Sequence, residues 1–343
     1  MLDDLKVINE RDAQDALGIA ERQWQQLQQG YNVELPDFGE ITTVVVGGMG
    51  GSALAAAITQ SWPQLNVPFE IVRNYNLPKY VNDKTLFIAS SYSGNTEETL
   101  AALDEAEQRG CKIVVVASGG KLEERASEKG YPFYKLPSGY QPRHAVFYNL
   151  AALIELFENL GLVAKGSQDE LKRAAEWLKG HAGSWLPTQA TTANQAKQIA
   201  LDVIGKSAVV YAGPKLWPAA YKWKISFNEN AKHIAWANQY PEFNHNEMMG
   251  WTEQPVDKPY AVIDLRSNLE HQRVQKRMEV AERLLSGRRP APIVVNAQGE
   301  TLLQQLLWTI TLGDFVSLYT AIANGINPTP VDLIEKFKKS LDE

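Results

Sequence analysis

Residues 41–62 have the sequence ITTVVVGGMGGSALAAAITQSW, in which an apolar run passes through a cluster of glycines into a stretch of helical composition. Such a run predicts a strand buried on both faces, as in a parallel sheet. The same order recurs at 84–110, where KTLFIASSY leads through a polar turn into TEETLAALDEAEQRG. Acidic residues open this second helix and Gly110 ends it. The pattern predicts an α/β fold with a doubly wound parallel sheet and helices on both faces.

The alternation of strands and helices occurs twice along the chain. In the first half we predict strands at 41–48, 69–74, 84–92 and 111–118, with a short one in YPFYKLP. In the second half we predict strands at 206–214, 258–267 and 291–299. The halves share an order of elements but no obvious sequence repeat, so an internal duplication stays a hypothesis. We predict two domains, 1–155 and 156–343, the second including linker helices and a C-terminal helix.

Composition narrows the class of protein. The 343 residues are 44% hydrophobic and 22% charged, as in globular proteins. The net charge is −6, whereas a nucleic-acid-binding protein usually has an excess of basic residues. The single cysteine, Cys111, excludes an internal disulfide framework and a multi-cysteine zinc site. No continuous apolar run reaches the roughly 18 residues of a membrane helix, and MLDDLKVINERD lacks a secretory apolar region. We therefore expect a cytoplasmic protein that needs no nucleic acid or membrane.

The glycine cluster GGMGGSALAAAI, at 47–58, is the first candidate binding segment. Glycines between a strand and a helix let a ligand approach the backbone, and the free N–H groups of the helix suit a phosphate. Gly48, Gly50 and Gly51 do not match the dinucleotide-binding pattern, and no Gly-Lys-Ser/Thr of a triphosphate loop follows. These residues alone leave open a turn that simply needs small side chains.

The segment SSYSGNTEET, at 90–99, is the second candidate. Ser91, Ser93 and Thr96 place three hydroxyls beside the N–H groups of a helix start, and such a cluster can bind phosphate without a metal or a lysine. Thr96 could instead cap the helix, but a cap explains only one hydroxyl. Both segments follow carboxyl ends of predicted parallel strands, where ligands of this fold bind. We therefore expect them to form one phosphate site.

These motifs resemble a known family. SSYSGNTEET is similar to the phosphosugar-binding loop of sugar isomerase (SIS) domains, and that loop specifies only a sugar phosphate. GGMGGSA, SYSGNTEET, QPRHA, FNEN and NHNEMMGW, in this order, resemble the bifunctional phosphoglucose/phosphomannose isomerases. QPRHA and FNEN…NHNE are the narrower signals, and the resemblance runs from about residue 40 to the C-terminus. It implies two SIS-type doubly wound parallel-sheet domains with flanking helices.

The resemblance also implies a set of site residues. Aldose–ketose isomerisation needs a base, a positive group near the enediolate and an acid/base group that opens the sugar ring. The implied phosphate-binding residues are Gly51, Ser52, Ser91, Ser93 and Thr96. The implied catalytic residues are Glu229 as the base, Arg143 beside the enediolate, His245 for ring opening and Lys336 near the ring oxygen. The family supplies the histidine from the neighbouring subunit and links the threonine found here at Thr329 to the acceptance of mannose as well as glucose.

Several alternatives stay open. Glu229 could be a solvated helix carboxylate, and Arg143 could pair with an acid at a helix start. His144 or His233 could open the sugar ring in place of His245. Lys338 or Lys339 could act near the ring oxygen in place of Lys336. A histidine follows the arginine of QPRHA where a small residue is expected, and AKHIAWANQYPEF is unusually aromatic. Both departures could alter the sugar that is accepted.

We therefore predict a homodimer that interconverts glucose 6-phosphate, and also mannose 6-phosphate, with fructose 6-phosphate through a cis-enediol. We expect no cofactor and no metal ion, since the sequence shows none of the His/Glu ligand clusters that the metal-dependent mannose isomerases need. One rival is a sugar-phosphate-binding SIS protein without catalysis, which would lack the base. The other is an isomerase for a different phosphosugar.

Overall fold

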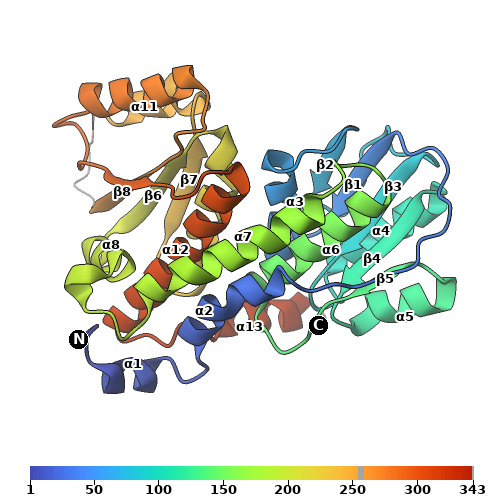
Figure 1. Ribbon diagram of the computed structural model, residues 1–343, viewed down its shortest axis with the longest axis horizontal. Coiled ribbons are helices and arrows are strands. Elements are labelled where there is room, and N and C mark those ends of the chain that lie inside the picture. The colour runs from blue at the N-terminus through green and yellow to red at the C-terminus, as the bar shows by residue number, and fades with distance from the viewer. Residues whose placement is uncertain (254–258, 342–343) are drawn as a thin grey trace. The chain divides into compact units, whose positions relative to one another are not determined.

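The computed structural model describes residues 1–253 and 259–341, and the chain divides into two compact units (Figure 1). One unit is Arg22–Trp177, here called the N-terminal unit. The other, called the C-terminal unit, combines Met1–Glu21 with Leu178–Glu343. The division falls within helix α2 (Ala16–Gln26) and helix α7 (Ser167–Ala182).

The N-terminal unit contains a five-stranded parallel sheet of order β2-β1-β3-β4-β5. Its strands are β1 Thr43–Gly47, β2 Phe69–Val72, β3 Thr85–Ser90, β4 Lys112–Ala117 and β5 Phe133–Lys135. Its helices are α3 Gly50–Ser61, α4 Glu97–Gln108, α5 Gly120–Lys129, the 3-10 helix η1 Pro142–His144 and α6 Val146–Asn159. Val45 and Phe87 pack with apolar residues of α4 and α5, whereas Val44 and Ile88, which alternate with them, are equally buried. Burial on both faces explains why β1, β3 and β4 read as continuous apolar runs.

The C-terminal unit contains a four-stranded parallel sheet of order β7-β6-β8-β9. Its strands are β6 Ser207–Ala212, β7 Ala235–Gln239, β8 Tyr260–Arg266 and β9 Ile293–Asn296. Its main helices are α1 Leu5–Arg11, α8 Gln195–Val203, α9 Trp217–Glu229, α10 Glu247–Gly250, α11 Gln272–Leu284, α12 Leu302–Ala323 and α13 Asp332–Leu341. Its 3-10 helices are η2 Gly183–Trp185, η3 Thr191–Ala193, η4 Pro214–Leu216 and η5 Glu242–His245. Residue 258, where we predicted the strand 258–267 to begin, lies outside the described residues.

Four strands of the first sheet have the same order as the four strands of the second. The order β2-β1-β3-β4 in the N-terminal unit has the same sequence of steps as β7-β6-β8-β9 in the C-terminal unit. The predicted fold class, two doubly wound α/β domains with flanking helices, is confirmed.

Helix α12 is the most apolar helix of the C-terminal unit. Among the described residues it is the one helix long and apolar enough to cross a membrane, yet 94% of its apolar window is buried inside the fold. Thr309, Thr311 and Gly313 interrupt its apolar residues, which is why the sequence shows no continuous run of that length. The helix packs against α8 and α9 and forms the core beside the second sheet.

The division of the chain differs from the boundary that we predicted between residues 155 and 156. Residue 155 lies inside the continuous helix α6, in the N-terminal unit. The first residues of the chain belong with the C-terminal unit, because Asp3 accepts hydrogen bonds from the backbone N–H and hydroxyl of Thr191, both at 2.8 Å. Lys197 donates to the same carboxylate at 3.1 Å. These polar contacts join residues far apart in sequence and leave no local pattern.

Candidate active site

The two predicted phosphate-binding turns meet at one edge of the first sheet. Gly47 at the end of β1 pairs with Ala89 near the end of β3, so the glycine turn and the serine turn leave the sheet side by side. The backbone N–H of Tyr92 donates to the Ser52 hydroxyl at 3.1 Å, which connects the turns directly. A Cβ at Gly48 would lie 2.7 Å from the carbonyl oxygen of Ser90, so close approach requires glycine there. The structure thus joins the two motifs into one loop pair.

The serine turn concentrates hydroxyl groups. The hydroxyls of Ser91 and Thr96 are hydrogen-bonded at 2.7 Å, and the Ser93 hydroxyl accepts from the N–H of Asn95 at 3.3 Å. Thr96 occupies the N-cap position of α4, yet its side chain makes no capping hydrogen bond to that helix. Gly94 has φ of +72°, and a Cβ there would lie 1.7 Å from the carbonyl oxygen of Gly119. The turn therefore has a shape that only glycine allows, and the Thr96 hydroxyl is not used as a cap.

Arg143 lies against the glycine turn. It belongs to η1, and it is only 1% exposed. A Cβ at Gly51 would lie 2.6 Å from the carbonyl oxygen of Pro142, so the segment of Arg143 packs directly on the start of α3. The Arg143 guanidinium donates to the side-chain oxygen of Gln141 at 3.4 Å. A permanent cation is thereby held in the same unit as the predicted phosphate turns. Its neighbour His144 is buried.

Glu229 is the last residue of α9, and polar contacts hold this helix against α12. The indole N–H of Trp223 donates to the carbonyl oxygen of Thr309 at 2.7 Å. One turn before Glu229, the hydroxyl of Ser226 donates to the carboxylate of Asp314 at 2.8 Å. Beyond it, the amide of Asn230 donates to Ser317 at 2.9 Å. The end of α9, with the half-buried Glu229, therefore has a fixed position in the C-terminal unit.

Lys232 links this helix end to the loop of Thr329. Its ammonium donates to the carbonyl oxygen of Glu229 at 2.7 Å and to that of Pro328 at 3.0 Å. Two of the predicted site residues are therefore brought together by a lysine that the sequence analysis did not single out. In the sequence, Lys232 could have been noticed only because it lies three residues after Glu229. Its φ of +54° is known only from the structure. Nearby, burial lowers the pKa of His233, which contacts Asn324 at 2.8 Å.

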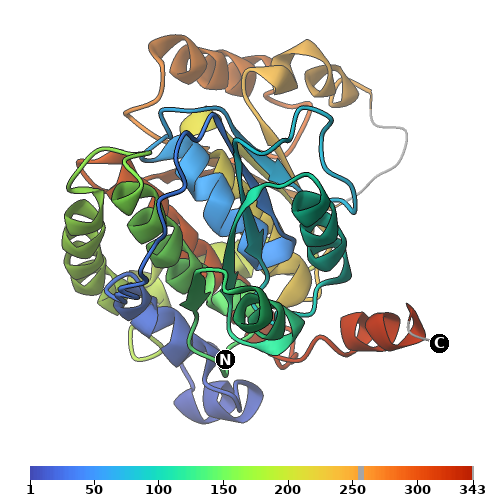
Figure 2. The ribbon, with the colours of Figure 1, turned by 90° about the vertical axis from the view of Figure 1, so that its right-hand side faces the viewer.

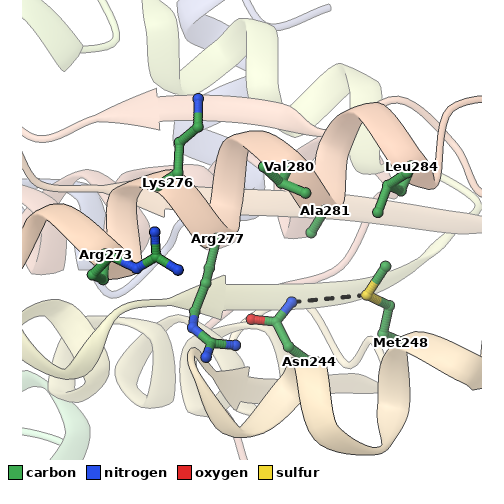
Figure 3. Close-up of a pocket in the computed structure, with 8 residues that line it drawn as sticks. All are labelled: Asn244, Met248, Arg273, Lys276, Arg277, Val280, Ala281 and Leu284. Atoms are coloured by element: carbon green, nitrogen blue, oxygen red, sulfur yellow. Dashed lines mark hydrogen bonds between the residues drawn. The ribbon is translucent and has the colours of Figure 1, made fainter.

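His245 is exposed at the end of η5. Within the described parts of the chain, no hydrogen bond to its imidazole is found. The adjacent Asn244 lines a groove of about 420 Å³ between the η5–α10 segment and α11, and Figure 3 shows Arg277 extending from α11 toward Asn244. Met248 lines the same groove and accepts a weak contact from Asn244 at 3.8 Å. His245 is thus presented to the outside of the C-terminal unit rather than to its core.

The C-terminal lysines lie on α13, the red helix beside the C label in Figure 2. Lys336, Lys338 and Lys339 are all exposed, and Lys338 pairs with Glu335 at 3.0 Å. The structure therefore leaves the choice among the three lysines as a prediction.

Taken unit by unit, the site residues form two groups. The N-terminal unit brings Arg143 together with the residues of the two turns, which are Gly51, Ser52, Ser91, Ser93 and Thr96. The C-terminal unit holds Glu229 beside Thr329, and it also carries the exposed His245 and Lys336. The first group can bind an oxyanion and the second offers a carboxylate base. Among residues 1–253 and 259–341, no group of three or more side chains of the metal-binding types is found.

Solved structures define the class of the fold. A glucose-6-phosphate isomerase like protein from Thermus thermophilus is 18% identical, with 98% of both chains covered and a TM-score of 0.63. Tagatose-6-phosphate ketose/aldose isomerase from Escherichia coli is 16% identical, covering 94% of this chain and 91% of that one, with a TM-score of 0.64. The fold is therefore that of the sugar isomerase (SIS) proteins.

Sequence relatives define the family. The family model described as bacterial phospho-glucose isomerase C-terminal SIS domain matches residues 192–341. A bifunctional phosphoglucose/phosphomannose isomerase of Aquifex aeolicus is 35% identical over 301 residues, which cover 87% of this chain and 90% of the relative. A D-glucosamine-6-phosphate 4-epimerase of Sulfolobus acidocaldarius is 33% identical over 222 residues, covering 64% and 68%. The chain belongs to the bifunctional phosphoglucose/phosphomannose isomerase family, and it is an isomerase.

Proposed function

We propose that the protein is a cytoplasmic homodimer that interconverts glucose 6-phosphate and mannose 6-phosphate with fructose 6-phosphate, without a metal ion or cofactor. The main observation behind this proposal is that a hydrogen bond joins the glycine and serine turns and that the segment of Arg143 packs on the glycine turn. The names of the relatives support the choice of sugars.

The substrate phosphate is bound by the two joined turns. Hydroxyls of Ser91, Ser93 and Thr96 and backbone N–H groups at the start of α4 supply hydrogen bonds to an anion. The glycines allow the phosphate to approach the backbone closely. Holding the sugar by its phosphate places C1 and C2 at a fixed distance from the turn, which is the positioning part of catalysis.

Proton transfer is assigned to Glu229 and charge stabilisation to Arg143. The carboxylate of Glu229 takes the C2 proton of the aldose and returns it to C1, so the intermediate is a cis-enediol. The guanidinium of Arg143 stabilises negative charge on O1 and O2 and keeps its own proton throughout the cycle.

Ring opening is assigned to His245 of the second subunit. An imidazole both gives and accepts a proton near neutral pH. Its exposure at the end of η5 supports a role outside its own unit. Lys336 acts near the ring oxygen. Thr329 follows Pro328, which Lys232 ties to Glu229, and it allows mannose 6-phosphate to be accepted as well as glucose 6-phosphate.

A coupled assay tests the proposal by measuring fructose 6-phosphate formed from glucose 6-phosphate and from mannose 6-phosphate, with and without a chelator. Glucosamine 6-phosphate serves as the competing substrate. We expect both hexoses to react at rates that the chelator leaves unchanged. Glu229→Gln should abolish turnover while KM stays near normal, because its shape is kept and its basicity is lost. Glu128→Gln, an exposed change in the N-terminal unit, is the matched control.

Three results would contradict this. Conversion of neither hexose refutes the substrate assignment. Loss of activity on chelation refutes metal independence, and wild-type turnover of Glu229→Gln refutes the assignment of the base.

A further inference from the structure

The segment that carries His245 rests on an aromatic cluster. The rings of Tyr211 and Phe243 are 4.7 Å apart, and those of Tyr240 and Phe243 are 5.0 Å apart. Trp251, which follows α10, donates its indole N–H to the Tyr211 hydroxyl at 3.1 Å. The cluster therefore lies under both ends of the stretch from residue 240 to residue 251.

A guanidinium group lies among these rings. The central carbon of Arg289 is 5.4 Å from the ring centre of Tyr211, 5.8 Å from that of Phe243 and 5.9 Å from that of Trp251. The side chain of Arg289 is only 1% exposed. Contacts of a cation with the faces of aromatic rings are directional, so one group restrains three rings from separate elements.

A carboxylate on the second sheet balances the charge of Arg289. Asp264 on β8 is fully buried, with its carboxylate 3.9 Å from Arg289 and 3.2 Å from Arg266. Burial raises the pKa of Asp264, and the two arginines oppose that rise. Arg266 in turn pairs with Glu282 on α11 at 2.7 Å. A buried charge is costly to desolvate, and an apolar side chain could fill the same space, so the charge of Arg289 is not explained by stability alone.

His245 lies between two residues that are tied to this cluster. Phe243, two positions before it, contacts Arg289, and Glu247, two positions after it, accepts hydrogen bonds from the Tyr211 hydroxyl and from Asn238. The imidazole itself has no hydrogen bond within the described residues. The position of its backbone is therefore set by the contacts of Phe243 and Glu247 on either side.

We propose that Arg289, neutralised by Asp264, is a positioning residue that orients His245 for ring opening. This inference rests on the proposed function, since it assumes that His245 takes part in the reaction. Arg289 touches no substrate and acts only through Phe243, Tyr211 and Trp251.

A double-mutant cycle tests this role. Arg289→Met keeps the length of the side chain and removes its charge and planar group, and it is made in the wild-type and His245→Ala backgrounds. Arg288→Met, at the exposed neighbouring position, is the matched control. We expect Arg289→Met to lower kcat about 10- to 100-fold when His245 is present, because small misplacements of a reacting group have effects of that size. In the His245→Ala background the further loss should be less than about two-fold, since coupled residues are not additive.

KM and inhibition by inorganic phosphate should stay unchanged, because the phosphate turns lie in the other unit. An equal fold-loss in both backgrounds would mean general damage and would overturn the proposal, as would wild-type kcat of Arg289→Met. If Arg289→Met does not fold, Arg289→Lys enters the same cycle, because lysine keeps the charge and loses the planar group.

The failure of the proposed function is recognised separately. Wild-type turnover of His245→Ala alone refutes the role of His245 in ring opening. In that case the imidazole NMR signals of His245 are compared between wild type and Arg289→Lys. A shifted signal supports the positioning role, and an unchanged signal overturns it.

Discussion

The buried ion pair between α9 and α12 allows a quantitative prediction for Asp314→Leu. Lys222 and Asp314 are in direct contact, and their side chains are 1% and 0% exposed. Removing the carboxylate leaves the Lys222 ammonium in the interior with the hydroxyl of Ser226, at 2.7 Å, as its hydrogen-bond partner. An uncompensated buried charge of this kind costs about 3–5 kcal/mol of unfolding free energy. We expect a loss in that range.

The assay is urea unfolding followed by tryptophan fluorescence, with the free energy of unfolding obtained by linear extrapolation. The control is the double variant Lys222→Met/Asp314→Leu, which removes both charges. Replacement of a buried pair by apolar residues is often neutral or stabilising, so this variant should lie within about 1 kcal/mol of wild type or above it. A loss below about 1 kcal/mol in the single variant, or a double variant as unstable as the single one, would refute the reasoning.

Three further predictions concern the sites. Thr96→Ala should weaken substrate binding by about 1–3 kcal/mol, the cost of a lost hydrogen bond to a charged group, and unchanged inhibition by phosphate would count against the site. Gly94→Ala should raise KM more than Thr96→Ala, because its Cβ would lie 1.7 Å from the carbonyl oxygen of Gly119; an unchanged KM would contradict the turn geometry. Mixing His245→Ala chains with Glu229→Gln chains should restore about a quarter of wild-type activity through heterodimers with one intact pocket, and zero recovery after confirmed subunit exchange would place His245 elsewhere.

Local sequence was sufficient for most of the strands and for the glycine and serine turns. Strands β1, β3, β4 and β6 are apolar runs, and their burial on both faces follows from that pattern. Strand β7, with the sequence AWANQ and only its first residue buried, has no such pattern and was not predicted. Gly48 and Gly94 mark backbone approaches that other residues would block, and both lie inside the motifs that predicted the turns. These features depend on residues close together in the chain, so they can be read without the fold.

The catalytic assignments needed more than local sequence. Glu229, His245 and Lys336 were proposed because the motifs around them resemble a family, since an isolated glutamate, histidine or lysine is most often a surface residue. In the structure Glu229 is fixed by the contacts between α9 and α12, and His245 is exposed above a buried arginine, while the catalytic roles of both residues stay predictions.

The sequence by itself determined the α/β alternation, the turn chemistry and the apolar character of α12, because propensity, glycine geometry and hydrophobic patterning act over a few residues. Only the tertiary structure decided that the first 21 residues belong with the C-terminal unit, that Lys232 joins Glu229 to the loop of Thr329, and that Arg289 lies under the segment of His245. These are polar and aromatic contacts between residues distant along the chain. Their energies depend on burial and direction, and a linear sequence specifies neither until the sheets have brought the partners together.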